Sequence, residues 1–349
     1  MTLPSLRPLG RSGLLVSPLT LGTMTMADPR WGSDEVTSAD VLDRYLASGG
    51  NAVDTADVYA GGAGEELLGR LIEERKIRHE LVIATKYGLA GGDRSIGGSG
   101  RVNLAQALEG SLRRLRVEHI DLYWLHRWDG VTPAEELVRA MDAQVGAGKI
   151  RYWGLSNVPA WFAAQVATLA ATGGCAGPVA LQLEYSLVAR GVEREHLPAA
   201  RALGLSLVPW SPLAGGFLTG KYRRVDQRID QEGRLISPDP SNPTPFTDDN
   251  WRALDVVRRV AARLERTPAD VALAWLLAQP QVDTVLVGAR TADQLEAAEA
   301  AVGHGLPAEE LELLEAEIPG GAGDGTDPFG PATRARLIGG GRLIDERPT

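Results

Sequence analysis

The sequence predicts an α/β protein folded as one (β/α)8 barrel of the TIM type. Its 349 residues are enough for one large core. Eight short apolar segments, each followed by an amphipathic segment, recur at steps of about thirty residues, as parallel strands alternating with helices do. A doubly wound sheet in two domains is the alternative, but no linker or shift in composition divides the chain.

Each expected strand is short and apolar, and turn-forming or polar residues bound it. The expected strands are residues 19–24, 52–54, 81–86, 120–126, 149–156, 179–185, 205–212 and 282–287. Between them, apolar residues recur at the helical period, with Pro133 at one helix start and Thr291 as an N-cap. The expected helices are residues 34–47, 65–75, 103–115, 133–145, 160–172, 194–203, 249–265, 267–279 and 292–302.

Three segments are additional to the barrel. A long loop after the seventh strand, residues 213–247, contains four prolines between 238 and 245 and cannot be a helix. Residues 306–317 are expected to form a further surface helix. The Gly- and Pro-rich residues 319–349 form either a disordered tail or a loop that covers the site. The expected organisation is therefore one barrel domain, 1–318, followed by this tail.

The composition excludes several classes of function. A net charge of −9, without a Lys- and Arg-rich patch, argues against nucleic acid and anionic membranes as partners. The single cysteine, Cys175, and five histidines without paired spacing predict no disulfide and no metal site. The chain shows no apolar leader and no run of ~18 apolar residues, so a cytoplasmic protein is expected. The oligomeric state stays open.

Four side chains that could perform proton chemistry follow three consecutive strands. Asp54, Lys86 and His126 stand at the ends of the second, third and fourth strands, and Tyr59 follows Asp54 by five residues. Taken singly, each has an ordinary structural interpretation, as a packed tyrosine, a solvated lysine or a core histidine. The carboxyl ends of barrel strands converge on one mouth, however, so we expect the four to be neighbours there.

Together these groups predict a proton donor directed at a carbonyl. A phenol has a pKa of about 10, too high for a good proton donor at neutral pH. A nearby ammonium favours the phenolate, and a carboxylate keeps that ammonium charged and oriented. A neutral imidazole can direct a carbonyl oxygen towards the phenol.

With these residues in place, the chain resembles the aldo/keto reductases over nearly its whole length. The shared motifs occur in the family's order: LGTM at 21–24, DTADVY at 54–59, TK at 85–86, LH at 125–126, GLSN at 154–157, QLEY at 182–185 and WSPL at 210–213. The resemblance implies that Tyr59 is the general acid/base, that Lys86 and Asp54 tune it, and that His126 orients the carbonyl.

The resemblance also implies NADPH as the cofactor. Nicotinamide would lie on Trp210, with its carboxamide held by Ser156, Asn157 and Gln182. Arg290 could pair with a 2′-phosphate, although a solvated helix-end arginine is the alternative. The other implied cofactor contacts are Gly22, Thr23, Met24, Asp54, Ser211, Pro212, Leu213, Gly215, Lys221, Gly288 and Gln294. Ala297 and Ala298 depart from the family, which commonly has an acidic residue and an asparagine for the adenine there.

The residues expected around the substrate form a mixed aromatic and cationic wall that suits an apolar or sugar ring. They are Met24, Trp31, Tyr59, Trp124, His126, Arg127 and Trp128. The sequence thus predicts an NADPH-dependent reductase of an aldehyde or ketone, for instance of a keto-sugar or natural product. The alternatives are a slow cofactor-binding regulatory subunit, like the potassium-channel β subunits, and a phosphate-binding lyase or isomerase. The last leaves Trp210 beside Gln182 unexplained.

Overall fold

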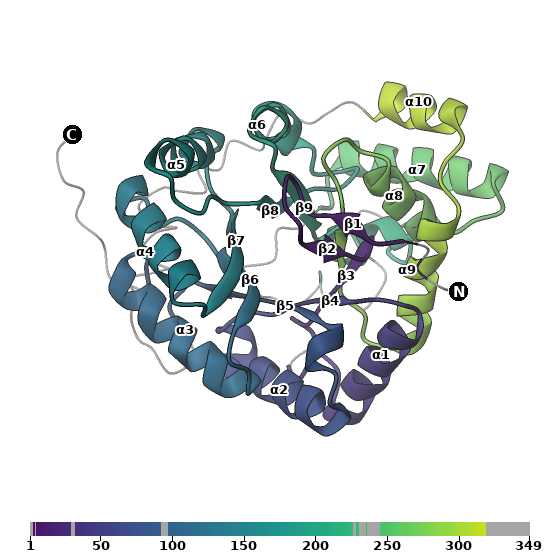
Figure 1. The fold of residues 1–349 in the computed structure, drawn as a ribbon. Helices are drawn as coiled ribbons and strands as arrows, with labels where there is room; N and C mark the ends of the chain where they lie inside the picture. Colours follow the sequence, from purple (N-terminus) through teal and green to yellow (C-terminus); the bar gives the residue numbers. More distant parts are fainter. Residues whose placement is uncertain are drawn as a thin grey trace.

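The structure, a computed structural model, describes residues 3, 5–28, 32–91, 97–225, 228–229, 235 and 245–318. Within these residues, eight parallel strands form one sheet in the order β12-β3-β4-β5-β6-β7-β8-β9 (Figure 1). The strands are β3 (Leu19–Gly22), β4 (Ala52–Asp54), β5 (Val82–Tyr87), β6 (Ile120–Leu125), β7 (Ile150–Ser156), β8 (Ala180–Glu184), β9 (Ser206–Trp210) and β12 (Val285–Val287). A parallel bridge between Leu207, in β9, and Val282, just before β12, joins the two edges of this sheet, so the sheet is a nearly closed barrel. The predicted fold class is confirmed.

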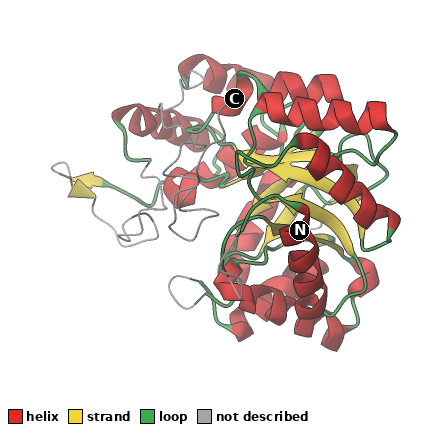
Figure 2. Ribbon diagram, turned by 90° about the vertical axis from the view of Figure 1, so that its left-hand side faces the viewer, coloured by secondary structure: helices red, strands yellow, loops and turns green. Residues whose placement is uncertain are grey.

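Helices lie outside the strands on all sides of the barrel, as Figures 1 and 2 show. The helices are α1 (Glu35–Ala47), α2 (Ala63–Arg75), α3 (Arg101–Leu115), α4 (Ala134–Gly146), α5 (Ala160–Gly173), α6 (His196–Leu203), α7 (Asp248–Arg263), α8 (Pro268–Leu277), α9 (Ala292–Gly303) and α10 (Ala308–Glu317). Four of them begin at a polar N-cap whose side chain accepts a main-chain N–H, namely Asp34, Thr247, Thr267 and Thr291. None of the described helices is long and apolar enough to cross a lipid bilayer.

The barrel interior is a separate apolar cluster inside the ring of strands. It consists of Leu9, Leu14, Val16, Ala52, Ala84, Leu122, Trp124, Ala180, Val208 and Leu286. The first three come from a hairpin, β1 (Arg7–Pro8) and β2 (Leu15–Val16), that the sequence did not predict. At Gly10, with φ +56°, a Cβ would lie 2.4 Å from the Val179 carbonyl oxygen, so the hairpin packs tightly against the start of β8. The hairpin therefore covers the amino-terminal end of the barrel.

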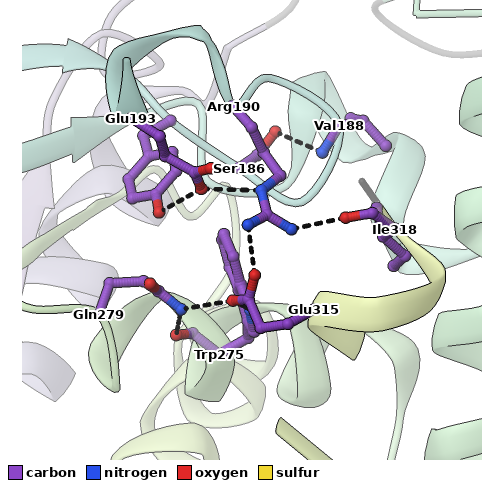
Figure 3. A network of polar contacts seen from close by, with 9 residues as sticks. Ser186, Val188, Arg190, Glu193, Trp275, Gln279, Glu315 and Ile318 are labelled. Carbon is purple, nitrogen blue, oxygen red and sulfur yellow. Dashed lines mark hydrogen bonds and ion pairs between the residues drawn. The ribbon is translucent and has the colours of Figure 1, made fainter. Parts of the chain in front are cut away.

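Arg190 ties α10 to the loop after β8 (Figure 3). Its Nε donates to Glu193 at 2.7 Å and its Nη1 to the Ile318 carbonyl at 2.6 Å, while Nη2 pairs with Glu315. The guanidinium lies 5.1 Å from the Trp275 ring centre. This contact fixes the last described turn of the chain on the barrel. The division between 1–318 and the tail remains a prediction, because 319–349 lie outside the described residues.

Candidate functional site

A sharp turn after β4 presents Tyr59. The turn, η1 (Tyr59–Gly62), is not a regular helix, because Ala60, Gly61 and Gly62 have φ values of 49°, 67° and 101°. These are left-handed conformations, which cost an alanine roughly 1–2 kcal/mol. The next helix packs directly under the turn, since a Cβ at Gly64 would lie 3.6 Å from the Tyr59 Cβ. The turn leaves Tyr59 half-buried at the carboxyl end of the strands.

The structure brings the four candidate catalytic side chains together at this mouth. Lys86 Nζ forms an ion pair with Asp54 and donates to the Thr55 carbonyl at 2.8 Å and to Tyr59 Oη at 3.2 Å. Lys86 is 1% exposed and Asp54 2%. The rings of Tyr59 and His126 meet edge to face with 6.0 Å between centroids. The proximity expected from the strand ends is present, while the catalytic roles remain predictions.

The charges of this cluster depend on burial and on each other. Burial alone would lower the pKa of Lys86, but the Asp54 carboxylate and Tyr59 outweigh it and keep that pKa above its ordinary value. Burial raises the pKa of Asp54, and the Lys86 ammonium and the Gln182 amide oppose this rise. Burial, with Lys86 and Arg127 as further causes, holds the pKa of His126 well below its ordinary value. The cluster therefore places an ammonium and a neutral imidazole next to a phenol.

Two residues from other strands complete the surroundings of Asp54. Gln182 Nε2 donates to Asp54 Oδ2 at 3.0 Å from across the barrel. The Trp124 indole nitrogen lies near enough to favour ionised Asp54, although its geometry falls short of a hydrogen bond. Trp124 is 1% exposed and belongs to the barrel interior. Trp124 therefore lies in the barrel interior close to Asp54, and its expected contact with substrate remains a prediction.

Asn157 connects the cluster around Tyr59 with Trp210. It has a left-handed φ of 51°, and its Nδ2 donates to the His126 carbonyl at 3.0 Å and to Ser156 Oγ at 2.9 Å. Its Oδ1 accepts the indole N–H of Trp210 at 3.2 Å. The half-buried indole is therefore held by its edge at the end of β9. Ser156, Asn157 and Trp210 lie together as the sequence predicted, with Gln182 on the neighbouring strand.

The chain after Trp210 follows an irregular path. Ser211 and Ala214 have φ values of 52° and 48°, and Gly215 and Gly216 follow at 65° and 92°. The Lys221 ammonium folds back over Gly216, where a Cβ would lie 3.2 Å from Nζ. Pro212, Leu213, Gly215 and Lys221 therefore line one compact bend next to Trp210, formed largely by the 3-10 helix η4 (Ala214–Thr219).

Arg290 and Gln294 stand at the start of α9. The Arg290 N–H donates to Gln294 Oε1 at 3.0 Å, so the Gln294 side chain caps its own helix. The Arg290 guanidinium is exposed and makes no ion pair within the part of the chain that the structure describes. Gly288 is exposed as well, while Ala298 faces the core. The charge of Arg290 is thus available to an anionic ligand.

Trp128, two residues after His126, belongs to an aromatic cluster with Trp161 and Phe162. Trp128 stacks on Phe162 with 4.4 Å between ring centroids. Trp161 contacts Trp128 edge to face, with 5.3 Å between their ring centroids. Trp161 is 57% exposed. Sequence reasoning missed Trp161 and Phe162, although two adjacent aromatic residues in the first turn of a helix cannot both face the core. Met24 and Arg127 are half-buried, and Trp31 lies outside the described residues.

Three buried polar atoms just after strand ends bear on whether a polar ligand fits here. Thr23 Oγ1, Thr55 Oγ1 and His126 Nδ1 are among the buried side-chain polar atoms that have no hydrogen-bond partner within the described residues. Such atoms are rare in native proteins unless a ligand, an ion or a water satisfies them. Together with the indole of Trp210 and the amides of Asn157 and Gln182, they fit a flat ligand with polar substituents, such as nicotinamide.

The other end of the barrel holds a cavity that is not lined by the cluster around Tyr59. Its volume is about 390 Å³, and it is lined by Arg11, Ser12, Arg151, Tyr152, Trp153, Ala176, Gly177, Pro178, Val179, Leu203 and Gly204. It shares no residue with the cluster around Tyr59. Among the described residues, no group of three or more His, Cys, Asp or Glu side chains could hold a metal ion. The paired and perturbed groups at the carboxyl ends of the strands therefore mark the candidate site.

Comparison with known proteins identifies relatives over nearly the whole chain. The family model described as "Aldo/keto reductase family" matches residues 18–318. The uncharacterized oxidoreductase YrpG of Bacillus subtilis is 36% identical, over 92% of this chain and 98% of that protein. A probable voltage-gated potassium channel subunit beta of Oryza sativa is 34% identical, over 82% of this chain and 88% of that protein. The aryl-alcohol dehydrogenase (NADP+) of Phanerodontia chrysosporium is 29% identical, over 88% and 84%.

Proposed function

Since the chain belongs to the aldo/keto reductase family, we propose that it is an NADPH-dependent reductase that converts an aldehyde or a ketone to an alcohol. The observation that carries the proposal is the position of Lys86 Nζ. It contacts both the Asp54 carboxylate and, at 3.2 Å, the Tyr59 hydroxyl. An ammonium held in this way lowers the cost of removing the phenol proton.

In the proposed reaction the protein delivers a proton. NADPH, when held beside Trp210, would supply the hydride for the reduction. Tyr59 gives its proton to the carbonyl oxygen, and the Lys86 ammonium stabilises the resulting phenolate while Asp54 holds the ammonium in place. His126 stays neutral because its pKa is lowered, so its N–H can orient the carbonyl oxygen without adding a charge.

The cofactor proposal rests on residues around Trp210 and Arg290. The Trp210 indole, fixed by Asn157, offers a platform for nicotinamide, and Ser156 and Gln182 lie beside it. Gly22 and Thr23 would form the floor of the site. The exposed Arg290 guanidinium at a helix start suits a 2′-phosphate, and one relative carries NADP+ in its name.

A second candidate function is supported by a different observation. The rice relative is named a potassium channel subunit beta, and it is more similar in sequence than the aryl-alcohol dehydrogenase. A protein of that kind would bind the cofactor in the same pocket and turn over slowly. The residues of the mouth fit both functions, so the rate of turnover separates them.

The test is NADPH consumption by the purified protein with a panel of aromatic aldehydes, aliphatic ketones and keto-sugars. Many turnovers per protein molecule, with the matching alcohol as product, would support the reductase. Oxidation that stops after one equivalent of NADPH would favour the regulatory subunit. A protein that neither binds NADPH nor oxidises it would contradict both.

A further inference from the structure

Glu65 is a fully buried carboxylate, 0% exposed, that takes no part in the cluster around Lys86. It lies in the first turn of α2, a few residues after Tyr59. Its two oxygens bind two different elements. Oε1 accepts the hydroxyl of Thr85 at 2.5 Å, and Oε2 accepts Arg114 Nε at 2.7 Å. Thr85 directly precedes Lys86 on β5, so Glu65 joins the segment that carries Tyr59 to the strand that carries Lys86.

The Arg114 side chain packs against the turn that carries Tyr59. A Cβ at Gly62, the last residue of the turn, would lie 3.2 Å from Arg114 Cδ and 3.4 Å from Nε. A Cβ at Gly110 would lie 3.0 Å from Arg114 Nη1. The Arg114 side chain therefore packs between Gly62 and Gly110. The Arg114 side chain is 16% exposed and the Glu65 side chain is 0% exposed, so this ion pair is largely shielded from water.

The turn that Arg114 supports cannot hold its shape alone. Ala60, Gly61 and Gly62 are all left-handed, and the alanine in particular is strained. Strained backbone persists only where its surroundings determine it. Here the surroundings include the Arg114 stem against Gly62 and the Glu65 carboxylate that fixes that stem. Loss of the pair would let the turn relax and carry Tyr59 with it.

We propose that Glu65 and Arg114 are positioning residues that hold Tyr59 Oη at hydrogen-bonding distance from Lys86 Nζ. The proposal rests on the proposed function of Tyr59 as proton donor and adds two residues that touch neither substrate nor cofactor. Proton transfer and charge stabilisation depend on distances of this order, and a displacement of about 1 Å can cost roughly a hundredfold in rate.

The test uses the double variant Glu65→Gln/Arg114→Met. It removes both charges together, so no buried charge is left uncompensated. The glutamine can still accept from Thr85, and the methionine retains much of the apolar stem beside Gly62. The matched control is Asp270→Asn/Arg266→Met, because Arg266, just before α8, and Asp270, in its first turn, form a comparable shielded pair with side chains 12% and 9% exposed. Each double variant loses one ion pair, but only the pair between Glu65 and Arg114 lies beside the turn that carries Tyr59.

We expect kcat of the Glu65→Gln/Arg114→Met variant to fall roughly tenfold to a hundredfold. NADPH affinity, measured by quenching of tryptophan fluorescence, should stay unchanged, and the pH at which activity is lost should move upward because Tyr59 is less well coupled to Lys86. A crystal structure of the variant should show an Oη–Nζ separation longer than 3.2 Å. The α8 control should keep the wild-type kcat, pH profile and separation even where its melting temperature falls.

A wild-type kcat, pH profile and separation in the folded Glu65→Gln/Arg114→Met variant would overturn the proposal. An equal fall of kcat in the α8 control would do the same, because the effect would then reflect general destabilisation. Failure of the proposed function is a separate result, in which the wild-type protein reduces no carbonyl. The separation between Tyr59 Oη and Lys86 Nζ in the variant structures then still decides the positioning role.

Discussion

The lowered pKa of His126 predicts how the stability of the fold depends on pH. Its pKa is held well below the ordinary value by burial, with Lys86 and Arg127 as further causes. The unfolded chain therefore takes up a proton near pH 6.5 that the folded chain refuses. Stability is lost as pH falls below about 7, with a slope of up to about 1.4 kcal/mol per pH unit from this group, until His126 is protonated in the folded state as well.

Urea unfolding at about pH 7.5 and about pH 5.5 checks this difference. The variant His126→Asn should lose less free energy of unfolding between the two values than the wild type does. His119 and His196, whose pKa values are also lowered, remain in both proteins and cancel in the comparison. Equal losses would mean that His126 titrates normally and that no neutral imidazole faces the carbonyl.

The position of Arg290 predicts a preference for NADPH over NADH. If its exposed guanidinium pairs with the 2′-phosphate, Arg290→Ala should weaken NADPH binding roughly ten- to a hundredfold and leave NADH binding nearly unchanged. Salt should weaken NADPH binding in the wild type more than in the variant, since the pair lies near the surface. Fluorescence titration with both cofactors measures this. Arg151→Ala, an exposed arginine at the opposite end of the barrel, is the control. Equal losses for NADPH and NADH would leave Arg290 an ordinary helix-end charge.

At the scale of the elements, β7 needs its glycine opposite a tryptophan. Gly154 pairs with Trp124 across the β6–β7 ladder, and a Cβ at Gly154 would lie 2.3 Å from the Trp124 ring and 2.8 Å from the Ala180 carbonyl. The fully buried indole has no room to move, so Gly154→Ala should lower the free energy of unfolding by at least about 1–3 kcal/mol. Gly303→Ala, at the end of α9 with nothing within 4 Å, should be neutral or slightly stabilising. Urea denaturation of both variants measures this, and a Gly154→Ala protein as stable as wild type would contradict the packing of the interior.

The attachment of α10 depends on Arg190. Arg190→Met would leave Glu193, Glu315 and the Ile318 carbonyl without their shared donor (Figure 3). We expect a loss of about 2–3 kcal/mol in the free energy of unfolding, because hydrogen bonds to charged groups contribute more than neutral ones. Arg259→Met, on α7, removes an exposed ion pair with Glu317 of α10, and it should cost less than about 1 kcal/mol. Similar losses in the two variants would show that burial of the Arg190 contacts adds nothing.

At the scale of the whole molecule, the sequence predicted the barrel and the mouth because both follow from local patterns. Apolar runs of strand length, each followed by a helical period, locate the strands without any knowledge of contacts. Asp54 and Lys86 end adjacent parallel strands, β4 and β5, so their proximity follows from the topology alone. The periodicity of the apolar residues and the order of the segments along the chain were therefore enough to predict the fold.

The features that the sequence did not predict depend on register and on contacts across the barrel. The β1–β2 hairpin has strands of two residues, too short to show any period. Trp124 stands in a strand that is apolar on both faces, so periodicity cannot tell whether it points into the barrel or outward. The hydrogen bond from Gln182 to Asp54 joins strands that are not neighbours, and it requires the closed barrel.

In the proposed function, the Tyr59 hydroxyl, coupled to Lys86, is the proton donor for a carbonyl reduced by NADPH. The most direct measurement compares wild type and Tyr59→Phe in carbonyl-dependent NADPH oxidation, with NADPH affinity determined in the same samples. The phenylalanine keeps the ring and removes only the proton, so the rate should fall roughly 10²–10⁴-fold while NADPH binds as before. A Tyr59→Phe protein that turns over at nearly the wild-type rate would contradict the claim.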